Sequence, residues 1–225
     1  MHVSPDASPA SRAAQAIRVW DLPTRLFHWL LTVLVVFSFV TAKVGGRWLD
    51  WHFYSGYAIL ALLVFRLLWG FAGNRYARFA SFVRGPRAVV DYVRGGPTSA
   101  GHNPLGALAV LLFLAALLLQ GVTGLFTSDD IASEGPLLKL VSSDLGALLA
   151  RVHRWNEKVL IAMVVLHLGA VAYYQWGRGR DLIVPMIRGD QHHAGLAGRD
   201  DALLRWRAAV LFAVAAGLVG WIVNL

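Results

Sequence analysis

The chain has 225 residues, of which 57% are hydrophobic and 15% charged, and its mean hydropathy is +0.55. A soluble protein of this length carries more charge, so the composition indicates an integral membrane protein and argues against a soluble enzyme. The net charge is +8, and the basic residues lie in particular loops, so membrane topology explains the charge better than nucleic-acid binding does. The chain has no cysteine, which excludes disulfides, covalent CxxCH haem attachment and thiolate-held iron–sulfur clusters.

In chain order, residues 1–17 are polar and rich in Ala, Ser and Pro, and we predict a disordered cytoplasmic tail without a secretory signal. Uncharged hydrophobic runs then predict five membrane-spanning helices, at about residues 26–42, 52–71, 104–126, 152–176 and 206–223. We expect an all-α integral membrane protein with one membrane domain over residues 18–190. Residues 191–225 would add a cytoplasmic connector and a fifth, C-terminal transmembrane helix.

The loops differ in charge, which predicts the orientation of the spans. Residues 73–103 carry five arginines against one aspartate: Arg75, Arg78, Arg84, Arg87 and Arg94. The positive-inside rule places this loop in the cytoplasm and the acidic loop before Arg151 outside. The N-terminus is then cytoplasmic and the C-terminus lies on the outer side.

The fourth span contains two histidines, His153 and His167, which are fourteen residues apart. That spacing is almost four helical turns, so both imidazoles leave one face of the helix, about 21 Å apart. A histidine inside a membrane span is costly unless it is paired or ligated. His28 in the first span and His52 in the second are the candidate partners.

Depth in the membrane predicts which histidines pair. The first span runs outward and the fourth inward, so His28 and His167 both lie toward the cytoplasmic side, about 12 and 13.5 Å from flanking tryptophans. His52 and His153 both open their spans at the outer surface. Two imidazoles that face each other can hold a flat macrocycle as six-coordinate iron, which favours electron transfer, whereas zinc would need a tetrahedral ligand set. We therefore predict two non-covalent b-type haems, each with a histidine pair as axial ligands.

Other polar and small residues in the spans are open to two interpretations. Arg66 either extends to the lipid headgroups or pairs with the propionates of an inner haem, and Arg25, one turn before His28, can serve similarly. Small residues allow close approach of a helix or a macrocycle, although ordinary membrane packing explains them equally well: Gly56, Gly121 and Gly124. His102 remains ambiguous, and we expect His192 and His193 to be solvated surface residues.

Several segments together resemble the bacterial cytochrome b561 and nickel-iron hydrogenase b-type cytochrome family. In order they are VWDLPTRLFHWLL, HFYSGY, RLLWGFAG, RYARFASF, GHNPLGAL, VHRWNEKVLIAMVVLHLGAV and VPMIRGD, within about residues 18–190. The resemblance implies a four-helix haem-binding bundle in the bacterial cytoplasmic membrane that exchanges electrons with quinone. It also implies haem ligation by His28, His52, His153 and His167. The fifth span departs from the family pattern.

These observations predict a dihaem cytochrome b, an electron-transfer subunit that works between quinone and a periplasmic redox protein, such as a hydrogenase-like or c-type cytochrome subunit. One alternative is a self-sufficient superoxide:quinone oxidoreductase, although the acidic third-to-fourth loop disfavours it. The other is a non-redox transporter whose histidines relay protons or bind a transition metal. A reduced-minus-oxidised spectrum separates the transporter from the two cytochromes.

Overall fold

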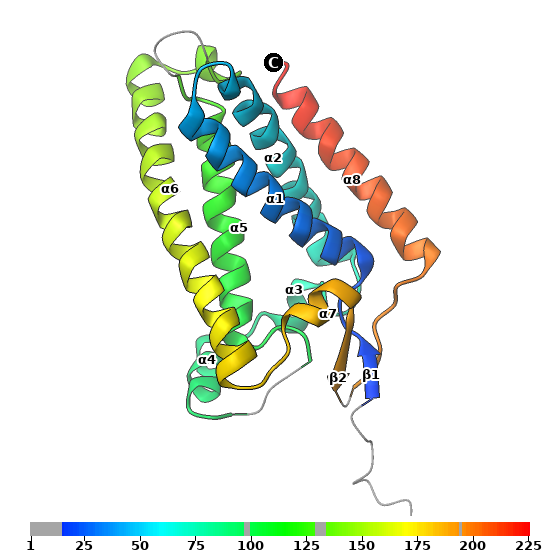
Figure 1. Ribbon diagram of the computed structural model, residues 1–225. Coiled ribbons are helices and arrows are strands. Elements are labelled where there is room, and N and C mark those ends of the chain that lie inside the picture. The colour runs from blue at the N-terminus through cyan, green and yellow to red at the C-terminus, as the bar shows by residue number, and fades with distance from the viewer. Residues whose placement is uncertain (1–14, 97–99, 129–133, 194) are drawn as a thin grey trace, which may run out of the picture.

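The structure is a computed structural model and describes residues 15–96, 100–128, 134–193 and 195–225. Five long helices run along the molecule (Figure 1): α1 Leu22–Val44, α2 Trp48–Ala72, α5 Pro104–Gly124, α6 Ser143–Ala172 and α8 Ala202–Ile222. All five are long and apolar enough to cross a membrane. The predicted all-α, multi-pass membrane fold is therefore confirmed.

Local sequence signals set where the long helices begin. Asp21, Asn103 and Asp201 cap α1, α5 and α8, and each side chain accepts a hydrogen bond of 2.7–2.8 Å from the N–H three residues on. Ser142 caps α6 in the same way, so this helix begins at Ser143 and not at about residue 152 as predicted. The additional turns extend α6 beyond the length that a membrane crossing requires.

Helix α2 is the centre of the bundle, because α1, α5 and α8 all pack on it. Its buried apolar side chains include Leu63, Phe65 and Trp69. The fifth long helix, α8, packs on α2 through Ala208 and Ala215 and is part of the bundle. By contrast, α6 packs mainly on α5 and is exposed along most of its length.

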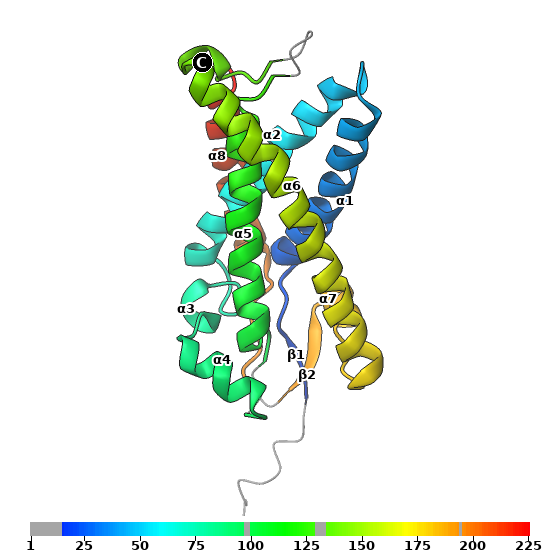
Figure 2. The same ribbon diagram turned by 90° about the vertical axis from the view of Figure 1, so that its left-hand side faces the viewer.

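Short elements gather at the lower end of the molecule in Figures 1 and 2. They are the helices α3 Phe79–Phe82, α4 Pro86–Val93 and α7 Ile183–Arg188, and the antiparallel strands β1 Gln15–Arg18 and β2 Asp190–His193. A 3-10 turn, η2 Leu138–Leu140, precedes α6, and a π-helical turn, η3 Tyr173–Gly177, ends it. The prediction of a disordered tail is wrong for residues 15–17, which form β1, while residues 1–14 lie outside the described residues.

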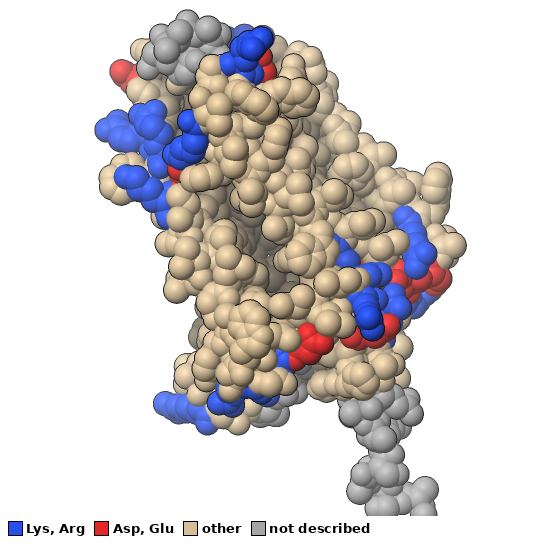
Figure 3. Space-filling view, in the orientation of Figure 1, with Lys and Arg blue, Asp and Glu red and all other residues tan. Residues whose placement is uncertain are grey.

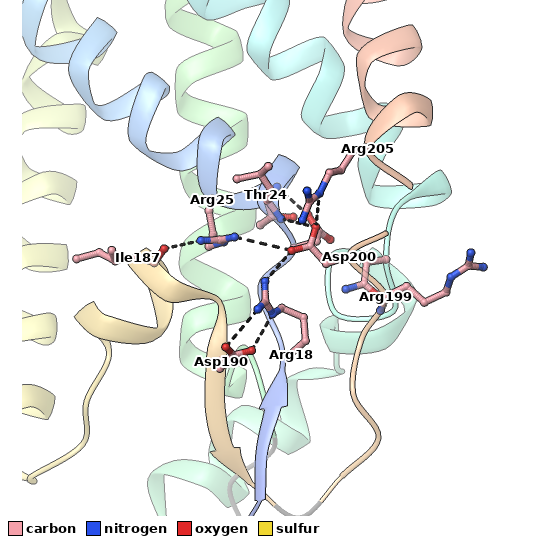
Figure 4. A network of polar contacts seen from close by, with 11 residues as sticks. Arg18, Thr24, Arg25, Ile187, Asp190, Arg199, Asp200 and Arg205 are labelled. Atoms are coloured by element: carbon pink, nitrogen blue, oxygen red, sulfur yellow. Dashed lines mark hydrogen bonds and ion pairs between the residues drawn. The ribbon is translucent and has the colours of Figure 1, made fainter. Parts of the chain in front are cut away.

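An ion-pair network around Asp200 holds α8 and the connector against the start of α1 (Figure 4). The Asp200 carboxylate lies 2.7 Å from Arg18 Nη1 and 3.1 Å from Arg205 Nε, and it accepts a 3.3 Å hydrogen bond from the Leu22 N–H. Arg18 also pairs with Asp190 on β2 at 2.7 Å. Segments that are almost the whole chain apart are thereby joined at one carboxylate.

We expect Asp200→Asn to lower the free energy of unfolding by about 2 kcal/mol, since a buried carboxylate loses its charge while the arginine partners remain partly solvated. Burial raises the pKa of Asp200, but the hydrogen bonds from Arg205 and Leu22 and the charges of Arg205 and Arg18 outweigh it, and the pKa is lowered. A lowered pKa stabilises the fold above the unfolded-state value, about 3.9, and this contribution is lost as the pH falls through the folded-state value. Thermal unfolding in detergent, followed against pH, measures both effects.

The neighbouring Asp201 provides the matched control. It is exposed and caps α8 by accepting the Leu204 N–H, and asparagine caps a helix about as well as aspartate does. Asp201→Asn should therefore change the melting temperature little. Equal destabilisation by the two substitutions would show that the Asp200 network has no special role in holding α8.

Candidate functional site

The structure brings His52 and His153 together, as predicted for the outer pair. His52 lies one turn from the start of α2, and His153 lies ten residues into α6. Their ring centroids are 6.3 Å apart and the rings are nearly perpendicular, at 89°. Two imidazoles on opposite sides of one metal, each bonded at about 2 Å, have a similar centroid separation.

Both imidazoles of this outer pair are held by main-chain carbonyl groups. His52 Nδ1 is 2.9 Å from the Ser38 carbonyl oxygen, and His153 Nδ1 is 2.9 Å from the Gln120 carbonyl oxygen. A carbonyl oxygen only accepts, so each Nδ1 carries the proton and donates it. The Nε2 atoms therefore keep their lone pairs, which is the tautomer that binds a metal through Nε2.

An amide pair, the half-buried Gln120 and the buried Asn156, supports the His153 side of the site. Gln120 Nε2 donates to His153 Nε2 at 3.0 Å, and Gln120 Oε1 accepts from Asn156 Nδ2 at 2.7 Å. Asn156 Nδ2 also donates to the Ala116 carbonyl at 2.9 Å. This chain of hydrogen bonds fixes α5 against α6 at the level of His153, and a metal at Nε2 would take the place of the Gln120 contact.

The predicted inner pair consists of His28 on α1 and His167 on α6, where His167 is exposed. They are close enough to interact electrostatically. The Phe113 ring contacts His167 edge-on with centroids 5.7 Å apart, and His28 Nδ1 is buried without a hydrogen-bond partner among the described residues. The two side chains thus have few competing partners, although no main-chain carbonyl orients them as in the outer pair.

The helices α1 and α6 that carry these histidines do not pack extensively on each other, and Figure 3 shows the surface hollowed between them. One turn after His153, Glu157 joins α6 to Lys43 of α1 through an ion pair of 2.6 Å. Beside His28, Trp29 Nε1 on α1 donates to the Met186 carbonyl of α7 at 3.1 Å. The hollow is therefore bounded at both ends and open along its length.

Arg66 lies inside the bundle and does not extend to the lipid headgroups. It is 3% exposed, its guanidinium carbon lies 5.0 Å from the centre of the Phe79 ring, and its Nη1 has no hydrogen-bond partner in the part of the chain that the structure describes. Asp21 and His102 are near enough to interact with it electrostatically. A buried cation with an unused donor is a suitable partner for an anionic group.

Arg25 is occupied differently. Its Nη1 donates to the Ile187 carbonyl of α7, and its Nη2 lies 3.8 Å from Asp200 (Figure 4). Arg25 therefore links α1 both to α7 and to the segment just before α8. Its Nε is buried without a hydrogen-bond partner among the described residues and is available to another group.

His102, whose role the sequence left ambiguous, is half-buried just before α5, with its Nδ1 atom inside the protein. Its ring packs against Trp20 and Phe82, with centroids 4.7 and 4.6 Å away. Burial lowers its pKa to about 3, with further lowering by the charges of Arg66 and His28. His102 is therefore neutral at physiological pH, and it is near enough to Arg66 to interact with it electrostatically.

Three glycines near the histidines have different surroundings. A Cβ on Gly121 would lie 2.5 Å from Leu60, which indicates close helix packing, and one on Gly124 would lie 3.0 Å from His153 Cε1. A Cβ on Gly56, one turn after His52, would meet nothing within 4 Å. The space beside the outer pair is thus open on the α2 side, as a large flat cofactor requires.

Taken together, these residues fit b-type haem better than a small metal ion. Within the described ranges, no group of three or more His, Cys, Asp or Glu side chains is placed to hold a metal. The imidazoles of His52 and His153 meet, and the open space beside His52 suits a planar macrocycle held between them.

No pattern in the sequence indicated a role for the Ser38 carbonyl or for the Gln120 and Asn156 amides. Main-chain acceptors carry no sequence signal. Gln120 and Asn156 were detectable as polar residues in apolar helices, which usually have a bonded partner inside a membrane bundle.

Comparison with known proteins identifies the family. The family model for prokaryotic cytochrome b561 matches residues 19–189. A "Probable Ni/Fe-hydrogenase B-type cytochrome subunit" of Azotobacter chroococcum mcd 1 is 24% identical over 220 residues, which cover 82% of this chain and 92% of the relative. Proteins with the same description from Azotobacter vinelandii and Rhizobium leguminosarum bv. viciae are 27% and 26% identical, over 53% and 49% of this chain and 62% and 59% of their own lengths.

No solved structure is significantly similar to the chain. The family match nevertheless covers most of the sequence, including all four paired histidines. The chain belongs to the prokaryotic cytochrome b561 family and is a multi-pass membrane b-type cytochrome that functions in electron transfer.

Proposed function

We propose that this cytochrome carries two b-type haems, each between the imidazoles of one histidine pair, and transfers electrons between a periplasmic redox protein and quinone. When bound, haem supplies reversible one-electron chemistry whose potential depends on its ligands and surroundings. His52 and His153 would hold the outer haem, and His28 and His167 the inner one. The protein would act mainly by placing and insulating these groups.

The outer histidine pair is the observation that carries this proposal. The centroids of its two imidazole rings lie 6.3 Å apart, and both Nδ1 atoms donate to main-chain carbonyls. Such outer hydrogen bonds fix the tautomer and the ring orientation of metal-binding histidines. A histidine that merely filled space in the bundle would not need the same arrangement on both partners.

At the inner pair, Arg66 is the better candidate for binding the haem propionates. It is buried and has an unused donor, whereas Arg25 already contacts Ile187 and lies near Asp200. His102 is near enough to this cation to interact with it electrostatically. An anionic propionate would compensate the charge of Arg66, which is otherwise costly inside a bundle.

The proposed orientation is that of the bacterial cytoplasmic membrane, with the short elements inside the cell. The helices α4 and α7, which carry Arg87 and Arg188, lie at the same end as β1 and β2 (Figure 1). The positive-inside rule places this end in the cytoplasm. The C-terminus of α8 and the start of α6 are then periplasmic.

The proposed partner is a periplasmic subunit of the hydrogenase type. The support is that the similar proteins from Azotobacter and Rhizobium are described as Ni/Fe-hydrogenase cytochrome subunits. Copurification of a periplasmic redox protein with this chain would support a complex of this kind. Superoxide-dependent quinone reduction by the isolated chain would instead support the self-sufficient oxidoreductase.

A polar cavity at the inner end is the proposed place of quinone reduction. Its volume is about 490 Å³, and Asn103, Tyr174, Arg180 and His192 are among the residues that line it. Tyr174 follows His167 by seven residues, so it lies on a similar face of the helix, about 10 Å nearer the cytoplasm. Quinone reduction consumes protons, which polar side chains beside the cytoplasm can deliver.

The test of the proposed function is a reduced-minus-oxidised spectrum of the purified protein with haem quantification per chain. We expect the bands of six-coordinate b-type haem and two haems per polypeptide. A single haem would contradict the two-haem assignment. A protein without these bands would contradict the cytochrome proposal and favour a histidine-based proton or metal transporter.

A substitution at Gly56 tests the open space beside the outer pair. Because a Cβ there meets nothing within 4 Å, Gly56→Leu should fold and place its side chain where the outer haem would lie. We expect haem content to fall toward half, with the inner haem retained. Gly217→Leu, on the exposed face of α8 and equally unobstructed, is the matched control and should keep both haems. Full haem content in Gly56→Leu would contradict this placement.

A further inference from the structure

Three basic residues form an exposed stripe at the outer end of α6: Arg151, Arg154 and Lys158. Their spacing places them on one side of the helix, turned away from His153. Figure 3 shows Lys and Arg side chains standing out from this edge of α6. We propose that this basic stripe is the docking surface for an acidic face of a periplasmic electron-transfer protein, an inference that rests on the proposed function.

Among the described residues, the three charges of the stripe are not neutralised by ion pairs within the protein. In the described parts of the chain, none of the three residues forms an ion pair, although Lys158 Nζ lies 4.0 Å from the centre of the Trp155 ring. The nearest acid on the helix, Glu157, is already paired with Lys43 on α1 at 2.6 Å. The stripe therefore presents cations that are available to a partner.

Membrane topology does not explain these residues either. They lie at the outer end of the bundle in the proposed orientation, where the positive-inside rule disfavours Lys and Arg. The charge-free stretch formed by the end of α6 and by η3 covers residues 159–177, which is about 28 Å and matches the hydrocarbon layer of a bilayer. Lys158 therefore marks the outer edge of the hydrocarbon layer, and the exposed ring of Trp155 lies just beyond it.

This depth distinguishes a protein partner from lipid headgroups. The headgroup region is about 5–7 Å thick on each side of the bilayer, whereas Arg151 lies about 10 Å farther out than Lys158 along the helix. Phosphates of the outer leaflet can reach Lys158 and Arg154 but fall short of Arg151. The stripe thus continues into the aqueous phase, where an acidic protein surface is the remaining partner of matching charge.

The position of the stripe suits electron transfer. Arg154 is near enough to His153 to interact with it electrostatically, so a protein docked here would lie beside the outer histidine pair. Complementary charges mainly raise the rate of association, by about 10- to 1,000-fold, and the gain falls as salt is added. The basic stripe should therefore control the encounter rate and leave the haem sites unchanged.

The experiment uses the haem-loaded protein in nanodiscs of uncharged lipid. The chemically reduced protein is mixed with an oxidised c-type cytochrome, either a strongly acidic or a strongly basic one, and one electron passes to each acceptor molecule. We expect the acidic acceptor to react about tenfold faster at low salt and to lose this advantage at high salt. Arg151→Glu should slow the acidic acceptor severalfold and speed up the basic one.

Controls separate the outcomes. Arg87→Glu, an exposed arginine on α4 at the opposite end, should change neither rate. A second variant, Arg154→Glu with Lys158→Glu, should act in the same direction as Arg151→Glu. If only this double variant has an effect, and only in nanodiscs containing anionic lipid, the stripe binds headgroups and the docking proposal is overturned. Equal rates for both acceptors in every variant also overturn it.

The proposed function fails in a different way. A purified chain without haem, or one whose haem is not reoxidised by an uncharged small-molecule oxidant, would contradict the proposed electron-transfer function itself. Normal reoxidation by the uncharged oxidant, with no dependence on the charge of the protein acceptor, would contradict only the docking surface.

Discussion

Replacement of His153 by Ala should leave the protein with one haem per chain, about half of the wild-type content. The substitution removes one of two imidazoles whose ring centroids lie 6.3 Å apart. His52 alone would supply only one of the two protein ligands that a six-coordinate haem iron needs. The inner pair, His28 and His167, lies on another level of the bundle and should keep its haem. Haem quantification with a redox titration measures the loss, because one of two midpoint potentials should disappear.

The pairing is tested by comparing single and double variants. His52→Ala should remove the same haem as His153→Ala, and the double variant should lose no more than either single one. His28→Ala should remove the other haem. His192→Ala, an exposed residue of β2, is the control and should retain both. If His153→Ala and His28→Ala abolish the same midpoint, the assignment of the pairs is wrong.

The membrane spans were predictable because bilayer thickness imposes their length and composition. The runs around residues 26–42 and 104–126 agree with α1 and α5 within a few residues at each end. The spatial pairing of His52 with His153 was predictable for the same reason, since span direction and helix rise fix the depth of each residue. Whether these residues bind haem stays a prediction.

Features outside the lipid were harder to predict. Hydropathy does not register the turns of α6 before residue 152, and only Ser142, followed by Asp144, marks the helix start. Strands β1 and β2 have four residues each, too few for a detectable alternation, and they pair residues about 170 positions apart. Such a contact depends on the assembled bundle and leaves no local pattern.

The burial of Arg66 could not be predicted from the sequence either. An arginine near the end of a span can extend toward the headgroups or point into the bundle, and the sequence does not distinguish these two side-chain directions. The structure places Arg66 inward because α3 folds back over the end of α2 and brings Phe79 against its guanidinium. This tertiary contact determines whether the charge is screened by water or remains buried.

Arg66→Gln is expected to lower the midpoint potential of the inner haem by on the order of 60 mV, equivalent to a tenfold change in the equilibrium constant for a one-electron couple. Reduction adds a negative charge, which a nearby buried cation stabilises, so removal of the cation disfavours the reduced form. Arg66 is 3% exposed, and water screens it little. Redox titration should show the shift at one haem, with the outer haem unchanged.

Two further variants separate charge from packing. Arg66→Lys keeps the cation and should restore most of the lost potential. Arg25→Gln should shift the potential less, because Arg25 contacts the Ile187 carbonyl and lies 3.8 Å from Asp200. An arginine that reached the headgroups would be screened by water and ions, and its removal would shift the potential only slightly. An unchanged midpoint in Arg66→Gln, at full haem content, would therefore show that Arg66 serves the packing of Phe79 and does not compensate the charge of the haem.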